Sequence, residues 1–306
     1  MRVLISADME GATGVTWPAD VEPGTEQWQR CRRMFTSDVN AAVAGFFAAG
    51  ADEVLVNEAH ATMRNLLLEE LDRRTVLLTG RHKELSMVEG IQDPEVGAVA
   101  FLGYHAAAGA EGVLAHTYLA NSITSVRVNG EIGSEGRLNS LVAAEYGVPV
   151  VLVTGDDRTC ADAAGYAPEA VTVAVKDCVS RYAAVCRPPE ETAAAIAAAA
   201  AQAGKQAGRR PPGAPAGSGA AAAGRATGNG ATGNGAPGDG AHGPDGFTVE
   251  IEVDAAQLAQ AAAIVPTVRR TGDRTVTYHS ATAWDMIRSF KTVTTMIAAA
   301  VEDNYG

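Results

Sequence analysis

The chain has 306 residues, enough for two ordinary domains, and 47% of them are hydrophobic, so it can bury a sizeable core. Its formal net charge is −12 and it has no run rich in Lys or Arg, which argues against a nucleic-acid-binding surface. No apolar stretch reaches the about 18 residues that a membrane span needs, and the first residues resemble a strand rather than a signal peptide. We therefore expect a cytoplasmic protein that binds neither nucleic acid nor membrane.

The first apolar run, residues 3–5, is typical of a buried parallel strand, and it gives way abruptly to polar residues. Asp8 and Glu10 follow the carboxyl end of this strand, which is the edge where ligands bind in open α/β sheets. Residues two apart in an extended segment project to the same side, so both carboxylates can face one cation. The simpler alternative is that they are loop acids that cap the next helix.

The next segments follow a β-α-β order. Apolar residues recur every three or four positions from Gln27 to Gly50, which predicts an amphipathic helix that the glycine ends. A second buried strand follows at residues 53–57 and leads to His60. This order implies a parallel sheet with a right-handed crossover, so His60 is expected at the same edge as the first two acids.

Two further histidines follow apolar runs. Short strands are predicted at residues 75–78 and 96–103, and the second of these leads directly to His105. His116 comes after another apolar stretch, residues 112–115. The pattern therefore brings several imidazoles towards strand ends, although a lone histidine at such a position is more often structural.

The middle of the chain contains a predicted hairpin and two more acids. The strand at residues 123–128 runs into Asn-Gly, a strong signal for a tight turn. Glu131 and Glu135 follow and precede a helix predicted at residues 138–146. A buried strand at residues 148–154 comes next, and the acid that caps the helix after it is predicted to be Asp157.

Composition changes sharply at residue 204. From there to residue 246 the chain is nearly all Gly, Ala, Pro and small polar residues, which cannot bury enough apolar surface to become ordered. Apolar and polar residues alternate strictly at residues 247–253, which predicts a strand with one face exposed to solvent. We therefore expect an α/β domain with a parallel sheet at residues 1–190, and a smaller α+β domain at residues 191–306 that contains a flexible insertion at about 204–246.

The strand ends and loops of the first domain together supply a set of candidate metal ligands: Asp8, Glu10, His60, His105, His116, and Glu131 or Glu135. Mixed imidazole and carboxylate ligands suit zinc, with manganese or cobalt as substitutes. The candidates exceed what one catalytic zinc needs, which suits two metals that share a carboxylate. No two of these candidate ligands have a local spacing such as H-E-x-x-H. The residues alone therefore favour equally a metallohydrolase and a structural role for these side chains.

Six short segments of the chain together form a recognisable pattern. They are Ser6-Ala7-Asp8-Met9-Glu10-Gly11, Val56-Asn57-Glu58-Ala59-His60, Ser86-Met87-Val88-Glu89-Gly90, Phe101-Leu102-Gly103-Tyr104-His105, Ala115-His116-Thr117 and Gly155-Asp156-Asp157-Arg158. They occur in the order seen in zinc-dependent D-aminopeptidases of the DppA type, so the chain resembles that family. The resemblance covers most of residues 1–200 and, more weakly, the C-terminal segment, and six matches in order are far more specific than any one of them.

The resemblance implies a flavodoxin-like first domain, a smaller α/β second domain and a metallo-aminopeptidase that removes N-terminal D-residues from short peptides. It also implies two zinc ions that activate water, and a ring-shaped homo-oligomer. His116 would be the catalytic histidine and Asp8 the bridging ligand. By motif match, the metal ligands would be Asp8, Glu10, His60, His105 and Glu135.

Two positions depart from the family pattern: Glu58 stands where Asp is usual, and Ser134 replaces the Gly that normally precedes the last ligand. Glu135 is preferred to Glu131 as that ligand because Leu138-Asn139 follows it near the spacing of the family.

Two other functions remain open. A metal-dependent amidase or L-aminopeptidase on the same scaffold would use the same ligands, because stereospecificity depends on the shape of the pocket. A non-catalytic peptide-binding module would also keep a metal, but it has no need of a proton donor, so His116 favours turnover. A nucleotide binder is disfavoured, because the chain has neither of the glycine motifs that cradle phosphate.

Overall fold

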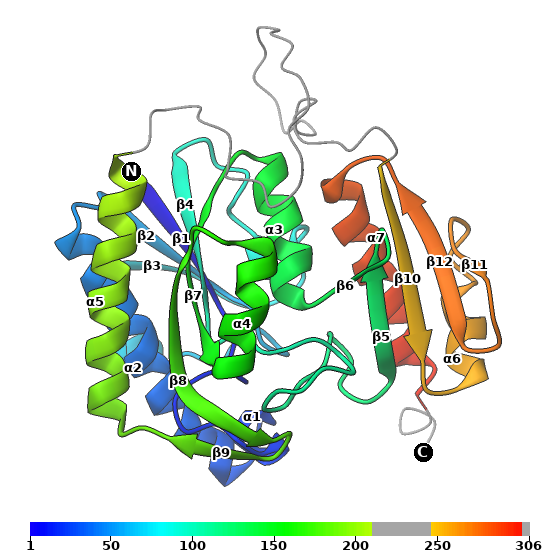
Figure 1. Cartoon of the computed structure of the whole chain (residues 1–306), viewed down its shortest axis with the longest axis horizontal. Helices are drawn as coiled ribbons and strands as arrows, with labels where there is room; N and C mark the ends of the chain where they lie inside the picture. The colour runs from blue at the N-terminus through cyan, green and yellow to red at the C-terminus, as the bar shows by residue number, and fades with distance from the viewer. Residues whose placement is uncertain (210–245, 302–306) are drawn as a thin grey trace, which may run out of the picture.

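The computed structural model describes residues 1–209 and 246–301. These residues form two sheets that stand side by side, with helices against each of them (Figure 1). Most of the expected insertion at about 204–246 lies outside the described residues, and its first five residues continue a helix. None of the described helices is long and apolar enough to cross a membrane.

The first sheet has the strand order β3-β2-β1-β4-β7-β8-β9, and every neighbouring pair is parallel except β8 with β9. The expected α/β architecture with a parallel sheet is therefore confirmed. The strands are β1 (Arg2–Ala7), β2 (Glu53–Glu58), β3 (Thr75–Leu78), β4 (Val96–Leu102), β7 (Val150–Asp156), β8 (Val171–Ser180) and β9 (Ala183–Cys186).

Helices cover both faces of this sheet, which is why β1 is apolar along its whole centre. Val3 and Ile5 belong to a core that includes α2 (Glu26–Ala48) and α5 (Pro189–Gly208). Leu4, which points the other way, belongs to the core that includes α3 and α4. The remaining helical segments beside this sheet are α1 (Pro18–Val21), η1 (Leu68–Glu70), η2 (Ser86–Val88), α3 (Glu135–Glu145) and α4 (Asp157–Tyr166).

The second sheet is antiparallel, with the order β11-β12-β10-β5-β6. Alternate residues of its central strand β10 are buried, as the sequence predicts, because helices cover only one face. Its elements are β5 (Ile123–Val128), β6 (Glu131–Ile132), β10 (Phe247–Val253), α6 (Ala256–Ala262), β11 (Arg269–Arg270), β12 (Thr275–Ser280) and α7 (Ala283–Ala299).

The two sheets do not divide at residue 190. The hairpin β5–β6 lies before that residue, yet β5 pairs with β10 in the second sheet. Conversely, α5 continues past residue 190 and packs against α2 on the first sheet. Pairing between strands so far apart in the chain leaves no local pattern in the sequence. The assignment of residues 1–190 and 191–306 to two domains stays a prediction.

The strand order reverses between β1 and β4. After β1 the chain adds β2 and β3 on one side, and it then returns to place β4 on the other side of β1. In flavodoxin-like sheets the third strand lies beside the first, whereas here β3 lies outside β2. Open α/β sheets bind ligands beyond the carboxyl ends of the strands at such a reversal.

Candidate metal centre

Six sequence-predicted side chains meet beyond the carboxyl ends of β1, β2 and β4, where the strand order reverses. Two follow β1, one follows β2, two lie in the segment after β4, and one begins α3. All are buried except His116, which is half-buried. They are Asp8, Glu10, His60, His105, His116 and Glu135.

Glu135 is the first residue of α3, and not part of a loop before it. The helix begins three residues earlier than predicted, because the Ser134 hydroxyl accepts a hydrogen bond from the Arg137 N–H and caps it. Glu131, the other candidate, is exposed on β6 and takes no part in the cluster. Of the two acids, only Glu135 therefore reaches the other candidate ligands.

The candidate ligand atoms form two groups that share Asp8. In the first group, His60 Nδ1 lies 3.7 Å from Asp8 Oδ1 and 2.9 Å from Glu10 Oε2. In the second, His105 Nε2 lies 3.3 Å from Asp8 Oδ2 and 3.4 Å from Glu135 Oε2. Within each group the three atoms lie within 4.8 Å of one another, a separation that one metal ion can span.

His116 stands at the side of both groups. Its ring stacks on that of His105, with the centroids 4.1 Å apart and the planes at 5°. Its Nε2 lies 3.8 Å from Glu10 Oε1 and 4.0 Å from Glu135 Oε1. Together with Glu10 and His105 it forms a third group of possible ligands.

Each imidazole turns its other nitrogen to a backbone carbonyl. His60 Nε2 lies 2.8 Å from Val21 O, and His116 Nδ1 lies 2.8 Å from Leu114 O. His105 Nδ1 lies 3.1 Å from the oxygen of the next residue. Because a carbonyl only accepts, each of these nitrogens carries the proton, and in the neutral ring the other nitrogen offers its lone pair to the cluster.

The carboxylates of the cluster need positive charge nearby, and the pKa shifts of its residues reflect this need. Burial and the neighbouring Glu10 raise the pKa of Asp8. Burial opposes charge on His60 and His105, but the carboxylates outweigh it: Glu10 and Asp8 raise the pKa of His60, and Glu135 and Asp8 raise that of His105. Burial and the neighbouring His105 instead lower the pKa of His116. Without a metal, these acids are therefore compensated only by protons held on His60 and His105.

While the imidazole nitrogens that face the cluster carry no proton, three buried atoms at its centre have no hydrogen-bond partner within the described residues: Asp8 Oδ2, Glu10 Oε2 and His105 Nε2. A buried polar atom without a partner is costly, and here three of them point into the same cluster. Cations bound in the two groups that share Asp8 would give all three atoms a partner. The residues present therefore fit a metal site with mixed imidazole and carboxylate ligands.

Comparison with known proteins shows the family. A family model described as D-aminopeptidase matches residues 1–222. The chain belongs to the D-aminopeptidase family. This confirms the prediction from the sequence that the chain is a member of this family and a hydrolase.

One sequence match and one structural match support this assignment. A D-aminopeptidase of Bacillus subtilis (strain 168) is 39% identical over 189 residues, which are 62% of this chain and 68% of the relative. A solved structure is described as the Zn-dependent D-aminopeptidase DppA from Bacillus subtilis, a self-compartmentalizing protease. It matches with a TM-score of 0.84 and 29% identity, over 98% of this chain and 99% of that one.

In this D-aminopeptidase family member, a buried lysine that the sequence analysis missed supports the loop after β1. Lys176 Nζ on β8 donates to the carbonyls of Glu10, Ala12 and Val15 at 2.7, 2.9 and 2.6 Å. Burial lowers its pKa to about 8. The available signal was a lysine that directly follows the apolar run at residues 171–175, but β8 itself was not predicted.

The loop that carries His60 is held by buried polar contacts. Asn65 Nδ2 donates to His60 O at 2.9 Å, and the Asn65 oxygen accepts from Trp28 Nε1 at 3.1 Å. The Glu58 carboxylate accepts from the backbone N–H groups of Asn65 and Leu66 and from the Thr79 hydroxyl. Glu58, which departs from the family pattern, therefore orders this loop.

The loop that carries His116 is held by hydrogen bonds to the N-termini of α4 and α3. Asp156, not Asp157, caps α4: its Oδ1 accepts from Thr159 N at 2.7 Å, and its Oδ2 accepts from Val113 N at 2.7 Å. The prediction of Asp157 as the cap was wrong by one residue, because β7 extends to Asp156. On the other side, Tyr118 N donates to Glu135 Oε1 at 2.7 Å.

Strained backbone lies beside the cluster. Ala61, Leu114 and Tyr118 have φ values of 46°, 52° and 63°, in a region that side chains rarely adopt. Gly11 allows the chains leaving β1 and β4 to touch, because a Cβ there would lie 1.9 Å from Tyr104 O. Such constraints concentrate at functional sites, where the surrounding structure enforces them.

Proposed function

We propose that the chain is a zinc-dependent aminopeptidase that removes N-terminal D-residues from short peptides with two zinc ions per subunit. One zinc would be held by Asp8, Glu10 and His60, and the other by Asp8, His105 and Glu135. The observation that carries this proposal is the pair of ligand groups that share Asp8, with unpartnered buried atoms in both. The resemblance to a structure described as a Zn-dependent D-aminopeptidase supports both the metal and the activity.

The charges agree with two divalent cations. The proposed ligands supply three carboxylates and two imidazoles, all buried. One divalent ion would leave a net negative charge in a site with little access to water, which is unfavourable. Two ions would leave a single positive charge, which suits a site that must polarise a carbonyl oxygen.

When bound, zinc polarises a peptide carbonyl and lowers the pKa of a bound water to about 7. The contribution of the chain is to orient the ligands through the contacts at Val21 O, Ala106 O and the Lys176 ammonium. His116 belongs to neither proposed ligand group, and its Nε2 faces the cluster. It would stabilise the developing oxyanion or pass a proton to the leaving amine, an effect of roughly 100- to 10,000-fold on rate.

The experiment that tests this proposal measures hydrolysis of matched, unblocked D-Ala and L-Ala dipeptides by metal-stripped protein before and after zinc is restored. Cleavage that depends on zinc and is confined to the D-peptide is the expected result. Cleavage of the L-peptide would replace it with a broader aminopeptidase or amidase. Cleavage of neither, by protein with full zinc, would favour a peptide-binding module.

Self-association into a ring-shaped homo-oligomer is also proposed. The similar solved structure is described as self-compartmentalizing, and the match spans nearly all of both chains. Light scattering on the purified protein measures the mass directly, and a monomer at micromolar concentration would contradict this part of the proposal. A cytoplasmic location stays a prediction.

A further inference from the structure

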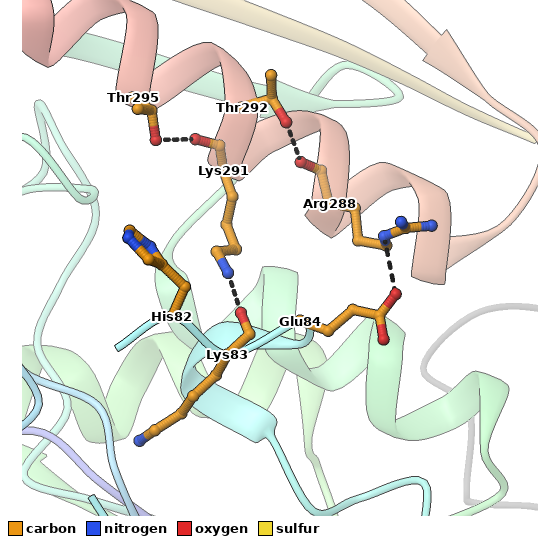
Figure 2. A pocket seen from close by; sticks show the side chains of 7 residues that line it. All are labelled: His82, Lys83, Glu84, Arg288, Lys291, Thr292 and Thr295. Carbon is orange, nitrogen blue, oxygen red and sulfur yellow. Dashed lines mark hydrogen bonds and ion pairs between the residues drawn. The ribbon is translucent and has the colours of Figure 1, made fainter. Parts of the chain in front are cut away.

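A cavity rich in cationic side chains lies between the segment after β3 and helix α7. Its volume is about 320 Å³, and Figure 2 shows Arg288 and Lys291 reaching into it from the helix. On the other side, residues 82–84 form the wall, and a neighbouring cavity of about 360 Å³ includes Arg81. The lining residues are His82, Lys83, Glu84, Arg288, Lys291, Thr292 and Thr295.

Two cations here have no carboxylate partner in the described part of the chain. Lys291 Nζ donates to the backbone oxygen of Lys83, and Arg81 Nη1 donates to Ala61 O at 3.1 Å. Arg288, by contrast, is paired with Glu84 at 3.2 Å. The ammonium of Lys83 itself turns away from the cavity and donates to Asn57 Oδ1 and Glu58 O.

The position of Lys291 is costly without an anion, whereas Arg81 is exposed. Lys291 is half-buried, and burial lowers the pKa of its ammonium, as do the neighbouring Arg81 and Arg288. Glu89 and Glu84 oppose this shift but do not cancel it. In a chain whose net charge is −12, two like charges held together this way indicate that a negatively charged ligand completes the site.

Both cations are connected to the metal cluster through few contacts. Arg81 is anchored on Ala61, the residue after His60. Tyr118 donates its N–H to Glu135 Oε1, and its ring packs edge-on against Phe290 with 4.9 Å between centroids. Phe290 directly precedes Lys291. Lys83, whose backbone oxygen accepts from Lys291, donates its own ammonium to Glu58 O, two residues before His60. The cations therefore lie beside the loop that carries this candidate ligand.

We infer that Arg81 and Lys291 bind the C-terminal carboxylate of a short peptide substrate. This inference rests on the proposed function, because it assumes that the N-terminal peptide bond lies at the metal cluster. A guanidinium and an ammonium together match a carboxylate through charge-assisted hydrogen bonds. The pair therefore selects peptides short enough to span the two sites and with a free C-terminus.

The test compares D-Ala-D-Ala as the free acid with its C-terminal carboxamide on the zinc-loaded enzyme. The wild type is expected to prefer the acid by about 10- to 100-fold in kcat/KM, the value of a charged hydrogen bond. Arg81→Gln and Lys291→Gln should each lower this ratio by lowering activity on the acid alone. Arg127→Gln is the matched control, because Arg127 is also exposed and donates to a backbone carbonyl, Gly130 O.

A binding measurement separates this inference from the proposed function. Calorimetry on zinc-loaded protein would use a D-Ala-D-Ala analogue with a reduced peptide bond, again as the acid and the amide. The carboxylate site is supported if the wild type binds the acid more tightly than the amide and if Arg81→Gln and Lys291→Gln each abolish this preference. This holds even if the protein hydrolyses nothing. Equal affinity of the wild type for acid and amide, or an acid preference that both variants retain, would overturn it.

Discussion

At the scale of single residues, His116 is distinguished from the other two histidines of the cluster by its contacts. Its Nε2 stays 3.8 Å or more from the nearest carboxylate oxygens, whereas His60 and His105 approach theirs more closely. Its side chain is also the most exposed of the three, at 12% against 9% for His60 and 1% for His105. A group that a substrate can reach without displacing a ligand is suited to proton transfer.

We therefore expect His116→Ala to keep its full zinc content and its thermal midpoint while kcat falls by roughly 100- to 10,000-fold. Metal analysis and kinetics on the same preparation check this. His279→Ala is the control, because His279 is exposed on β12 and far from the cluster in the fold. A His116→Ala protein with full zinc and full activity would defeat the assignment.

At the scale of elements, the lysine of β8 holds the loop that leaves β1. The loop from Glu10 to Val15 points three carbonyls inward, and the buried Lys176 ammonium satisfies all three. An apolar residue at this position would leave these oxygens without a donor, at about 1 to 3 kcal/mol for each group. The same loop carries Glu10, so the support also affects the proposed metal site.

Lys176→Met is expected to lower the free energy of unfolding by about 3 kcal/mol or more and to weaken zinc binding. Urea denaturation of metal-free protein and zinc titration measure the two effects separately. Lys205→Met provides the comparison, since Lys205 is exposed on α5. If Lys176→Met bound zinc as tightly as the wild type, the lysine would have a role in stability alone.

At the scale of the whole molecule, exposed apolar side chains gather near the free edge of the first sheet. Val179 and Val185 on the β8–β9 hairpin are 67% and 61% exposed. Trp17 and Tyr182 are 54% and 40% exposed, and their rings contact each other with centroids 5.1 Å apart. A strand edge with apolar neighbours is prone to pair with another chain. The turn of this hairpin also reaches the loop of His116, because Arg181 O accepts from Leu114 N at 2.8 Å.

If the chain self-associates as proposed, the double variant Val179→Glu, Val185→Glu should lower the mass of the particle, because charges at a buried interface are unfavourable. Size-exclusion chromatography with light scattering measures this. Leu68→Glu and Ile264→Glu are matched controls, because these side chains are equally exposed, at 68% and 69%, but lie elsewhere. An unchanged mass in the double variant would place the contact on another surface.

The sequence by itself determined the elements whose patterns are local. The runs in β1 to β4 and the 3.6-residue period of α2 specify buried strands and a helix, because each depends only on neighbouring residues. Because parallel strands end at one edge of the sheet, this pattern also predicts that Asp8, Glu10, His60 and His105 lie together. That part of the site follows from topology alone.

The tertiary structure alone decided the features that depend on distant residues. Pairing of β5 with β10 moved the hairpin into the second sheet, and the half-buried, partly charged β8 gave too weak an alternation to be predicted. Only packing shows that Glu135 faces the cluster while Glu131 faces solvent, and that Lys176 supports the loop from across the sheet. The physical reason is common to all three: burial and long-range contacts, rather than local propensity, determine which polar side chains meet.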